Sequence, residues 1–168
     1  TFTGSTSVTT IDVPFLAITQ EQFWGIPVNK TLVLQNLIDI QWQTNGLPPI
    51  TGLDLWVDDI EFYPAKSPTA TPTWCNGEKF DDLEDNDDTN SFGGFWYVYK
   101  NTNSTLTAPA EPPAAFTPGA GGANGSNYAA RFIGTVSNDD VAYIGMGSNL
   151  SSTGGARNMS AFVGVTFW

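Results

Sequence analysis

The densest group of possible metal ligands is an acidic run over residues 81–90. It reads Asp-Asp-Leu-Glu-Asp-Asn-Asp-Asp-Thr-Asn. Carboxylates this close together repel one another unless a cation or solvent relieves the repulsion, and calcium takes roughly six to eight oxygen ligands from loops of this kind. The spacing is not that of an EF-hand, because the glycine and the final glutamate are misplaced. The run is therefore either a calcium loop or a solvated acidic turn.

Planar polar side chains over residues 37–44 indicate a second chemistry, the binding of sugar hydroxyls. Two sets of residues alternate there: Ile38, Ile40 and Trp42, and between them Asp39, Gln41 and Gln43. Successive side chains of a strand point to opposite faces. The apolar set, Trp42 included, is therefore predicted to face the core. The polar set is predicted to face outward, where amides and carboxylates can hydrogen-bond to a sugar.

Aromatic residues alternate in the same way over 95–100. Trp96 falls in one set and Tyr97 and Tyr99 in the other, so one of the two sets faces away from the core. Arg131 is out of phase with the apolar Phe132, which makes it the one basic residue predicted on a strand face. Aromatic rings stack on the C–H faces of sugars, and planar polar groups bind their hydroxyls. We therefore predict a carbohydrate site, the alternative being surface or inter-subunit residues; its members are Gln41, Gln43, Tyr97, Tyr99 and Arg131.

Several catalytic mechanisms lack the residues they need. The chain has no histidine, which excludes Ser-His-Asp and Cys-His catalysis and zinc sites built on imidazole. Its one cysteine, Cys75, cannot form an internal disulfide. A glycoside hydrolase needs two carboxylates about 5–10 Å apart across a cleft, whereas Asp58 and Asp59 are neighbours that point to opposite faces of a predicted strand. We expect no enzymatic activity.

The composition predicts an all-β fold and limits the partners. The chain has 17 glycines, 11 prolines and 13% aromatic residues, and its apolar residues show no long helical spacing. This composition is typical of a loop-rich antiparallel β-sandwich. A net charge of −11 with six basic residues argues against nucleic acid and anionic membrane surfaces. No apolar run approaches the roughly 20 residues that span a bilayer. Several Asn-x-Ser/Thr sequences suit an extracellular, secreted or cell-surface protein.

A Pro/Thr-rich segment divides the chain. Residues 65–73 read Ala-Lys-Ser-Pro-Thr-Ala-Thr-Pro-Thr and have almost nothing to bury, which predicts a linker over 65–79 between the parts 1–64 and 80–168. Long Gly/Pro/Ala loops, notably 108–127, suggest binding surfaces or insertions. The predicted strands are 9–15, 37–44 and 53–62 before the linker, and 95–100, 128–136, 141–146 and 162–168 after it.

Both parts carry a family resemblance. The first part contains Val-Pro-Phe at 13–15, Ile-Gln-Trp-Gln at 40–43 and Asp-Leu-Trp-Val-Asp-Asp-Ile at 54–60. These motifs are similar to the C-terminal half of galactose-binding-domain-like jelly rolls, especially the family-eleven type of carbohydrate-binding module. The second part, with Phe-Asp-Asp-Leu-Glu-Asp at 80–85 and Gly-Gly-Phe-Trp-Tyr at 93–97, resembles the first half of the same domain type.

The resemblance implies a jelly roll with its halves in swapped order. A hairpin of roughly 20–30 residues, which such modules place between the last residues and the first, is absent. Three arrangements stay open: a circular permutant, one register of a tandem array completed by neighbouring copies, or a fragment. Native proteins avoid bare strand edges, so we predict that both ends pair with each other or with adjacent subunits. Complementation between copies would propagate into a filament.

The resemblance also implies a structural calcium near the first strand of the module, with the last strand alongside. The candidate ligands are Glu84, Asp87, Asp88, Asn90 and Asp59. Two functions follow. The first is a non-catalytic carbohydrate-binding module, a repeated unit of a larger secreted or surface protein that binds a polysaccharide or glycan. The second is a structural subunit of an extracellular filament or surface layer that self-associates with identical copies.

Overall fold

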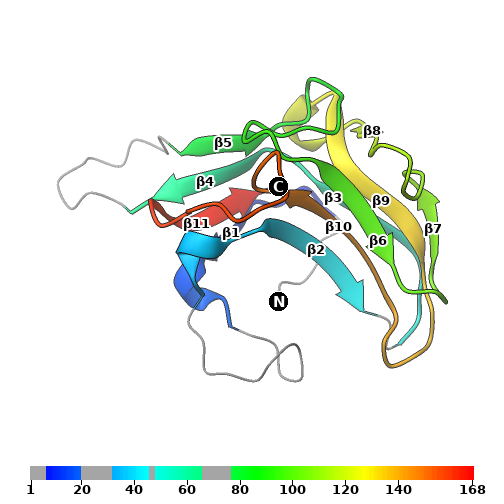
Figure 1. The fold of residues 1–168 in the computed structure, drawn as a ribbon. Helices are drawn as coiled ribbons and strands as arrows, with labels where there is room; N and C mark the ends of the chain where they lie inside the picture. The colour runs from blue at the N-terminus through cyan, green and yellow to red at the C-terminus, as the bar shows by residue number, and fades with distance from the viewer. Residues whose placement is uncertain (1–6, 20–31, 46–47, 66–76) are drawn as a thin grey trace.

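The chain folds as an antiparallel β-sandwich, as predicted. The computed structural model describes residues 7–19, 32–45, 48–65 and 77–168. This part of the chain contains eleven β-strands and three short 3-10 helices but no α-helix (Figure 1). Every strand pairing within it is antiparallel. The scarcity of straight-chain helix formers explains why no longer helix competes with the strands.

One layer of the sandwich is a sheet with the strand order β2–β10–β6. β2 spans Asp39–Asn45, β10 spans Tyr143–Asn149 and β6 spans Trp96–Lys100. In the register, Trp42 lies opposite Met146, which lies opposite Val98. All three are buried. Trp42 is therefore a core residue, as the alternation predicted.

The other layer consists of two sheets joined end to end. β3 continues into β4 across Asp58, whose backbone exchanges two hydrogen bonds with Trp168 (3.1 and 2.9 Å) just after β11. The first sheet has the order β1–β11–β4–β5: Ile11–Pro14, Phe162–Phe167, Ile60–Pro64 and Glu78–Asp81. The second has the order β3–β9–β7, with β8 also paired to β9: Ile50–Val57, Tyr128–Val136, Thr105–Ala108 and Gly119–Ala120. Helices η1, η2 and η3 span Phe15–Ala17, Leu34–Asn36 and Ala123–Gly125.

Aromatic rings hold the two layers together. Trp42 stacks on Trp96 with a centroid distance of 5.7 Å and meets Phe167 of β11 edge-on at 5.4 Å. A second cluster surrounds Phe62 of β4, and pairs of this geometry contribute about 0.5–1.5 kcal/mol each beyond their buried area. The partners of Phe62, at 5.3 to 6.2 Å, are Phe15, Phe80, Phe92 and Phe162.

Strands from the two parts of the sequence pair with each other. β1, β2, β3 and β4 precede the predicted linker, and their partners β11, β10, β9 and β5 follow it. β1 and β11, the first and last strands, pair with Ile11 opposite Phe167. The two parts thus form one sandwich within a single chain. Cys75 and residues 66–76 of the predicted linker lie outside the described residues, and Glu78 and Lys79 belong to β5 and not to the linker.

The predicted strand over 53–62 is two strands. Asp59 adopts a left-handed conformation with φ 47°, and the Asp58 carboxylate accepts the N–H groups of Asp59 and Ala123, both at 2.8 Å. The break is visible in the sequence, because the core-facing set shifts phase by one residue at this point. That set is Leu53, Leu55, Val57, Ile60 and Phe62. The short strands β5, β7 and β8 were not predicted.

Candidate functional site

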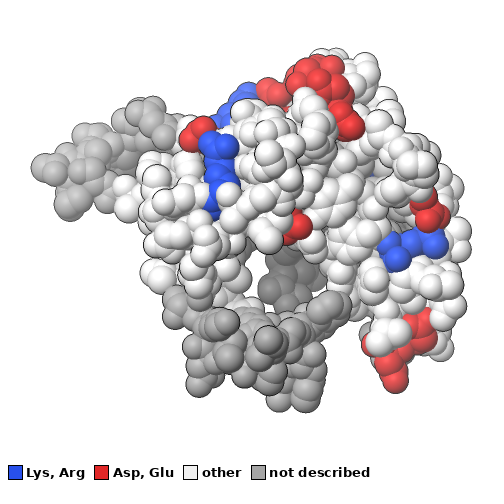
Figure 2. Space-filling model, in the orientation of Figure 1, with Lys and Arg blue, Asp and Glu red and all other residues white. Residues whose placement is uncertain are grey.

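The outer face of the β2–β10–β6 sheet carries four of the five residues predicted to bind carbohydrate. Alternation along each strand turns these side chains away from the buried face. The three strands curve together as an arch (Figure 1), and most of the described surface seen from this side is uncharged (Figure 2). Two rows of residues cross this face, Gln41–Gly147–Tyr97 and Gln43–Gly145–Tyr99.

Glycine on the central strand allows the tyrosine side chains to lie across it. A Cβ at Gly147 would lie 2.7 Å from the hydroxyl oxygen of Tyr97, and a Cβ at Gly145 would lie 2.4 Å from Cζ of Tyr99. Contacts this short do not occur between real atoms, so any side chain at either glycine would displace a tyrosine. The two rings therefore rest on the backbone of β10.

Gln41 links the two tyrosines. The Tyr99 hydroxyl donates to Oε1 of Gln41 at 3.0 Å, and Nε2 of Gln41 donates to the Tyr97 hydroxyl oxygen at 3.0 Å. The same Nε2 and the Tyr97 hydroxyl both donate to Oδ2 of Asp39, at 3.0 and 2.7 Å. These four side chains restrain one another, so a ligand would not have to order them on binding.

Both tyrosines keep their protons at physiological pH. Burial, followed by the hydrogen bond and the charge of Asp39, raises the pKa of Tyr97. Burial and then the Asp39 charge raise the pKa of Tyr99 to about 12. A neutral phenol can both donate and accept a hydrogen bond. The face therefore offers two neutral hydroxyls, an amide and one carboxylate.

Further aromatic residues extend this face. The ring centroid of Tyr143 lies 6.0 Å from that of Tyr99, which lies 6.0 Å from Tyr97. Phe95 precedes β6 in phase with Tyr97 and is 45% exposed. Gln43 lies toward the same end as Tyr143, with its Nε2 donating to Oδ1 of Asn45 at 2.8 Å.

The sequence analysis predicted a strand over 141–146 but did not assign its outward-facing residues to this face. Tyr143, Gly145 and Gly147 alternate with the buried Ile144 and Met146. The alternation argument that found the outward residues of β2 and β6 would have identified these three as well. What it could not show is that the glycines accommodate tyrosines from a strand more than forty residues earlier.

Arg131, the fifth predicted residue, does not belong to this face. It lies on β9 in the other layer, where Nε and Nη2 donate to Oδ1 and Oδ2 of Asp54, both at 2.8 Å. Its guanidinium lies 4.0 Å from the ring centroid of Trp56. Alternation correctly predicted that Arg131 points away from the core. It could not predict which sheet the strand joins.

Among the predicted calcium ligands, Asn90 forms hydrogen bonds within the protein through both its amide nitrogen and its amide oxygen. Its Nδ2 donates to the Ser148 hydroxyl and the Asn149 carbonyl, at 2.7 and 2.8 Å. Its Oδ1 accepts the N–H groups of Phe92 and Gly94, at 2.9 and 3.1 Å. Asn90 is buried and ties the acidic loop to β10. It presents no side-chain oxygen to an ion.

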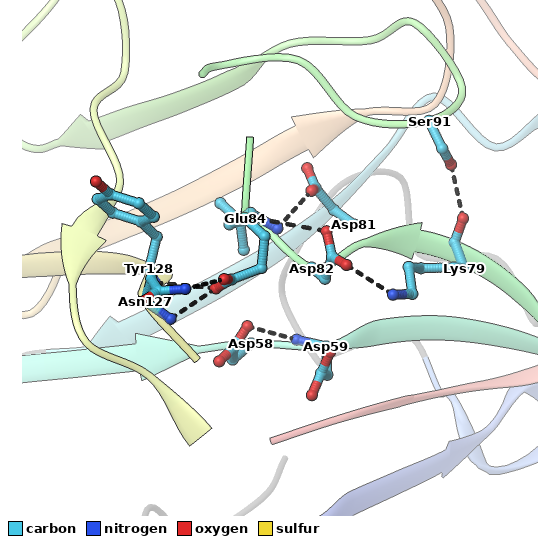
Figure 3. A network of polar contacts seen from close by, with 10 residues as sticks. Asp58, Asp59, Lys79, Asp81, Asp82, Glu84, Ser91, Asn127 and Tyr128 are labelled. Atoms are coloured by element: carbon cyan, nitrogen blue, oxygen red, sulfur yellow. Dashed lines mark hydrogen bonds and ion pairs between the residues drawn. The ribbon is translucent and has the colours of Figure 1, made fainter. Parts of the chain in front are cut away.

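Two other predicted ligands also have protein partners. The Glu84 carboxylate accepts Nδ2 and N–H of Asn127 and the N–H of Tyr128, at 2.7, 2.8 and 3.1 Å (Figure 3). These hydrogen bonds, with Asn127 first, lower the pKa of Glu84. Oδ1 of Asp87 accepts both the N–H and the hydroxyl of Thr89, at 2.7 Å.

The remaining pair, Asp59 and Asp88, does not complete a site. Burial raises the pKa of Asp59, and Lys79 lies beside it, bound to Asp82 at 2.6 Å (Figure 3). The backbone carbonyl of Asp88 accepts the N–H of Trp96 at 2.7 Å. Within residues 7–19, 32–45, 48–65 and 77–168, no three acidic or cysteine side chains are grouped to hold a metal ion. Calcium stays a prediction from the resemblance.

Comparisons with protein-family models, curated proteins and solved structures gave no match. The likeness to galactose-binding-domain-like modules therefore stays an expectation from the motifs, and function has to be argued from the site itself. In the described part of the chain, no helix has the length and hydropathy to cross a bilayer.

Proposed function

We propose that this chain is a non-catalytic, extracellular carbohydrate-binding module that binds a polysaccharide or glycan on the outer face of the β2–β10–β6 sheet. The observation that supports this most is the placement of Tyr97 and Tyr99 over Gly147 and Gly145. Gln41 holds both hydroxyls in position from the opposite edge of the sheet.

The chemistry of this face suits a neutral sugar chain. Aromatic rings supply apolar area at a low cost in conformational entropy, and their hydroxyls supply hydrogen bonds. The network around Gln41 is already formed without a ligand, which removes about 0.5–1.5 kcal/mol of ordering cost for each side chain. Asp39 is the charged member of the network, and the whole chain carries a net charge of −11. Sulfated or uronic acid polymers are therefore disfavoured.

The test is calorimetric titration of the full chain with a fixed panel of hexasaccharides derived from cellulose, xylan, mannan, chitin and laminarin. At least one should bind, and Tyr97→Ala and Tyr99→Ala should each weaken that binding at least about tenfold, or about 1.4 kcal/mol. Tyr63→Ala, at a half-buried tyrosine of the other layer, is the matched control. Absence of binding across the panel, or equal affinity in both face variants, would refute the proposal.

A second candidate, the self-associating subunit of a filament or surface layer, is favoured by a different observation. Five large apolar residues with exposures of 41 to 94% lie in the segments beside β1 and β2. Within the described residues each of these two strands has a partner on one side only. Exposed apolar area beside open edges is typical of association sites. The five residues are Val8, Leu16, Ile18, Val33 and Ile38.

Light scattering and electron microscopy test this candidate. If the surface mediates assembly, the chain should form oligomers or filaments, and Leu16→Ser combined with Ile18→Ser should return it to monomers. Val141→Ser is the control, because Val141 is also exposed (73%) but follows the acidic turn that precedes β10. A monodisperse monomer at high concentration would leave the binding module as the one function proposed.

A further inference from the structure

One aromatic side chain is exposed on the outer face of the β3–β9–β7 sheet. Trp56 lies on the edge strand β3 between the inward-facing Leu55 and Val57, and it is 37% exposed. No other large hydrophobic residue is exposed on β3, β7, β8 or β9, all of which the structure describes. Tryptophan usually contributes its large area to a core or to an interface, so its position here needs a reason.

The indole lies against the ion pair of Arg131 and Asp54. Arg131 lies directly opposite Trp56 in the register, and its guanidinium lies 4.0 Å from the ring centroid. Trp56 adds weakly to the lowering of the Asp54 pKa, for which Arg131 is the main cause. Asp54 in turn binds Arg131 through both carboxylate oxygens at 2.8 Å. The ring and the ion pair therefore form one connected unit on the surface.

Glycines lie beside this unit, where larger side chains would crowd Trp56 and Arg131. A Cβ at Gly121 would lie 4.0 Å from Cζ3 of Trp56, and a Cβ at Gly119 would lie 2.8 Å from Cδ of Arg131. Gly52, at the register shift two residues before Asp54 on β3, has open space where a side chain would be. The guanidinium covers one face of the indole, and 37% of Trp56 remains exposed.

We propose that Trp56, Arg131 and Asp54 form a second carbohydrate-binding site that takes one sugar ring of a polysaccharide. The indole stacks on the C–H face of the sugar. The ion pair uses two of the five guanidinium hydrogens, so Arg131 has donors left for sugar hydroxyls. The exposed carboxylate of Asp54 accepts from neighbouring hydroxyls. The site lies in the opposite layer and is independent of the tyrosine face.

A sugar fits this surface better than a protein partner does. Stable protein interfaces bury about 1,200–2,000 Å² and have an apolar centre built from several side chains. Here a single exposed ring is surrounded by glycines and an ion pair. One planar ring flanked by polar groups matches a single pyranose. Sites on two layers also allow one module to contact two sugar chains, or one chain twice, which raises avidity.

The test uses the indole N–H resonances in two-dimensional ¹⁵N spectra of the full chain. The resonance of Trp56 is identified by its loss in Trp56→Phe. The same five hexasaccharides are titrated into the wild type and into Tyr97→Ala/Tyr99→Ala. We expect a saturable shift of the Trp56 resonance with at least one sugar in both proteins. Arg131→Gln should weaken it at least fivefold, whereas Lys79→Gln, which breaks a surface ion pair elsewhere, should not.

The outcomes separate this proposal from the proposed function. A Trp56 shift that persists in the double tyrosine variant supports the second site, whether or not the tyrosine face binds sugar. Tyrosine-dependent binding without a Trp56 shift overturns the second site alone. Absence of any Trp56 shift across the panel in the wild type also overturns the second site. This wild-type measurement is valid even if the double tyrosine variant does not fold.

Discussion

The carboxylate of Asp81 accepts a hydrogen bond from the indole Nε1 of Trp96 at 2.7 Å. Its other oxygen accepts the N–H of Leu83 at 2.8 Å. Trp96 stacks on Trp42, so this carboxylate lies at the margin of the aromatic core. Burial raises the pKa of Asp81 to about 6, against the lowering effect of both hydrogen bonds.

This pKa predicts a pH dependence of stability. The ordinary pKa of the group is 3.8, so between about pH 4 and pH 6 the folded state binds more protons than the unfolded chain. The contribution of Asp81 to the free energy of unfolding therefore falls as the pH rises through this window, by up to about 3 kcal/mol. Urea denaturation at several pH values should show this contribution as a difference in slope between the wild type and Asp81→Asn.

For Asp81→Asn, the informative quantity is the slope of the unfolding free energy against pH. An amide has one oxygen in place of two, so the variant loses one buried hydrogen bond and about 1–3 kcal/mol at every pH. That constant loss does not change the slope. Other carboxylates add slopes of both signs, because burial raises the pKa of Asp58 whereas hydrogen bonds lower the pKa of Glu84, so the difference between wild type and variant reports on Asp81. Identical slopes in wild type and variant would contradict the assignment.

Gly147→Ala should impair sugar binding with little effect on folding. The new Cβ would meet side-chain atoms only, the hydroxyl end of Tyr97 and Cγ of Gln41 at 3.0 Å. Gln41 is exposed and Tyr97 is half-buried at the sheet surface, so both side chains can shift and we expect a change of less than about 1 kcal/mol in unfolding free energy. Affinity for the sugar that binds the wild type should fall about tenfold. Gly155→Ala, on the loop after β10, is the control and should bind normally.

Asn90→Ala should destabilise the protein by about 2–4 kcal/mol, because it leaves buried partners on Ser148 and Phe92 without a hydrogen bond. Asp87→Ala, which removes an exposed turn contact, should cost less than about 1 kcal/mol. Thermal melting with calcium and with a chelator distinguishes two roles for Asn90. A structural role gives the same loss in both conditions, whereas a loss seen with calcium alone would make Asn90 a ligand.

The two parts of the chain should stay together after the connection between them is cut. Four strands of the first part pair with strands of the second, and Phe62 packs against Phe80, Phe92 and Phe162. A protease site introduced at residues 70–72 and cleaved should give two fragments that co-elute with the mass of one chain. Separation of the fragments, or strand exchange into larger species, would contradict a sandwich closed within one chain.

Much of the local structure followed from the sequence. Alternation identified β9 at its observed bounds, placed Trp42 in the core and Gln41 on an outer face, and put Tyr97 and Tyr99 together on one face of their strand. It could do so because the side chains of a strand have a period of two, set by the backbone of that strand alone. The same rule, read more closely, would have shown the phase shift at Asp58.

The assembly of the site was decided by tertiary structure. Gln41 and Tyr97 are 56 residues apart in sequence, and they meet because both β2 and β6 pair with β10. Arg131 has the same alternation signal but lies in the other layer, where Trp56 and Asp54 contact it. The resemblance suggested Asn90 as an ion ligand, and the fold buries this residue with its amide bonded to Ser148. Sequence periodicity determines which way a side chain points, whereas strand pairing and burial over long separations determine what it meets.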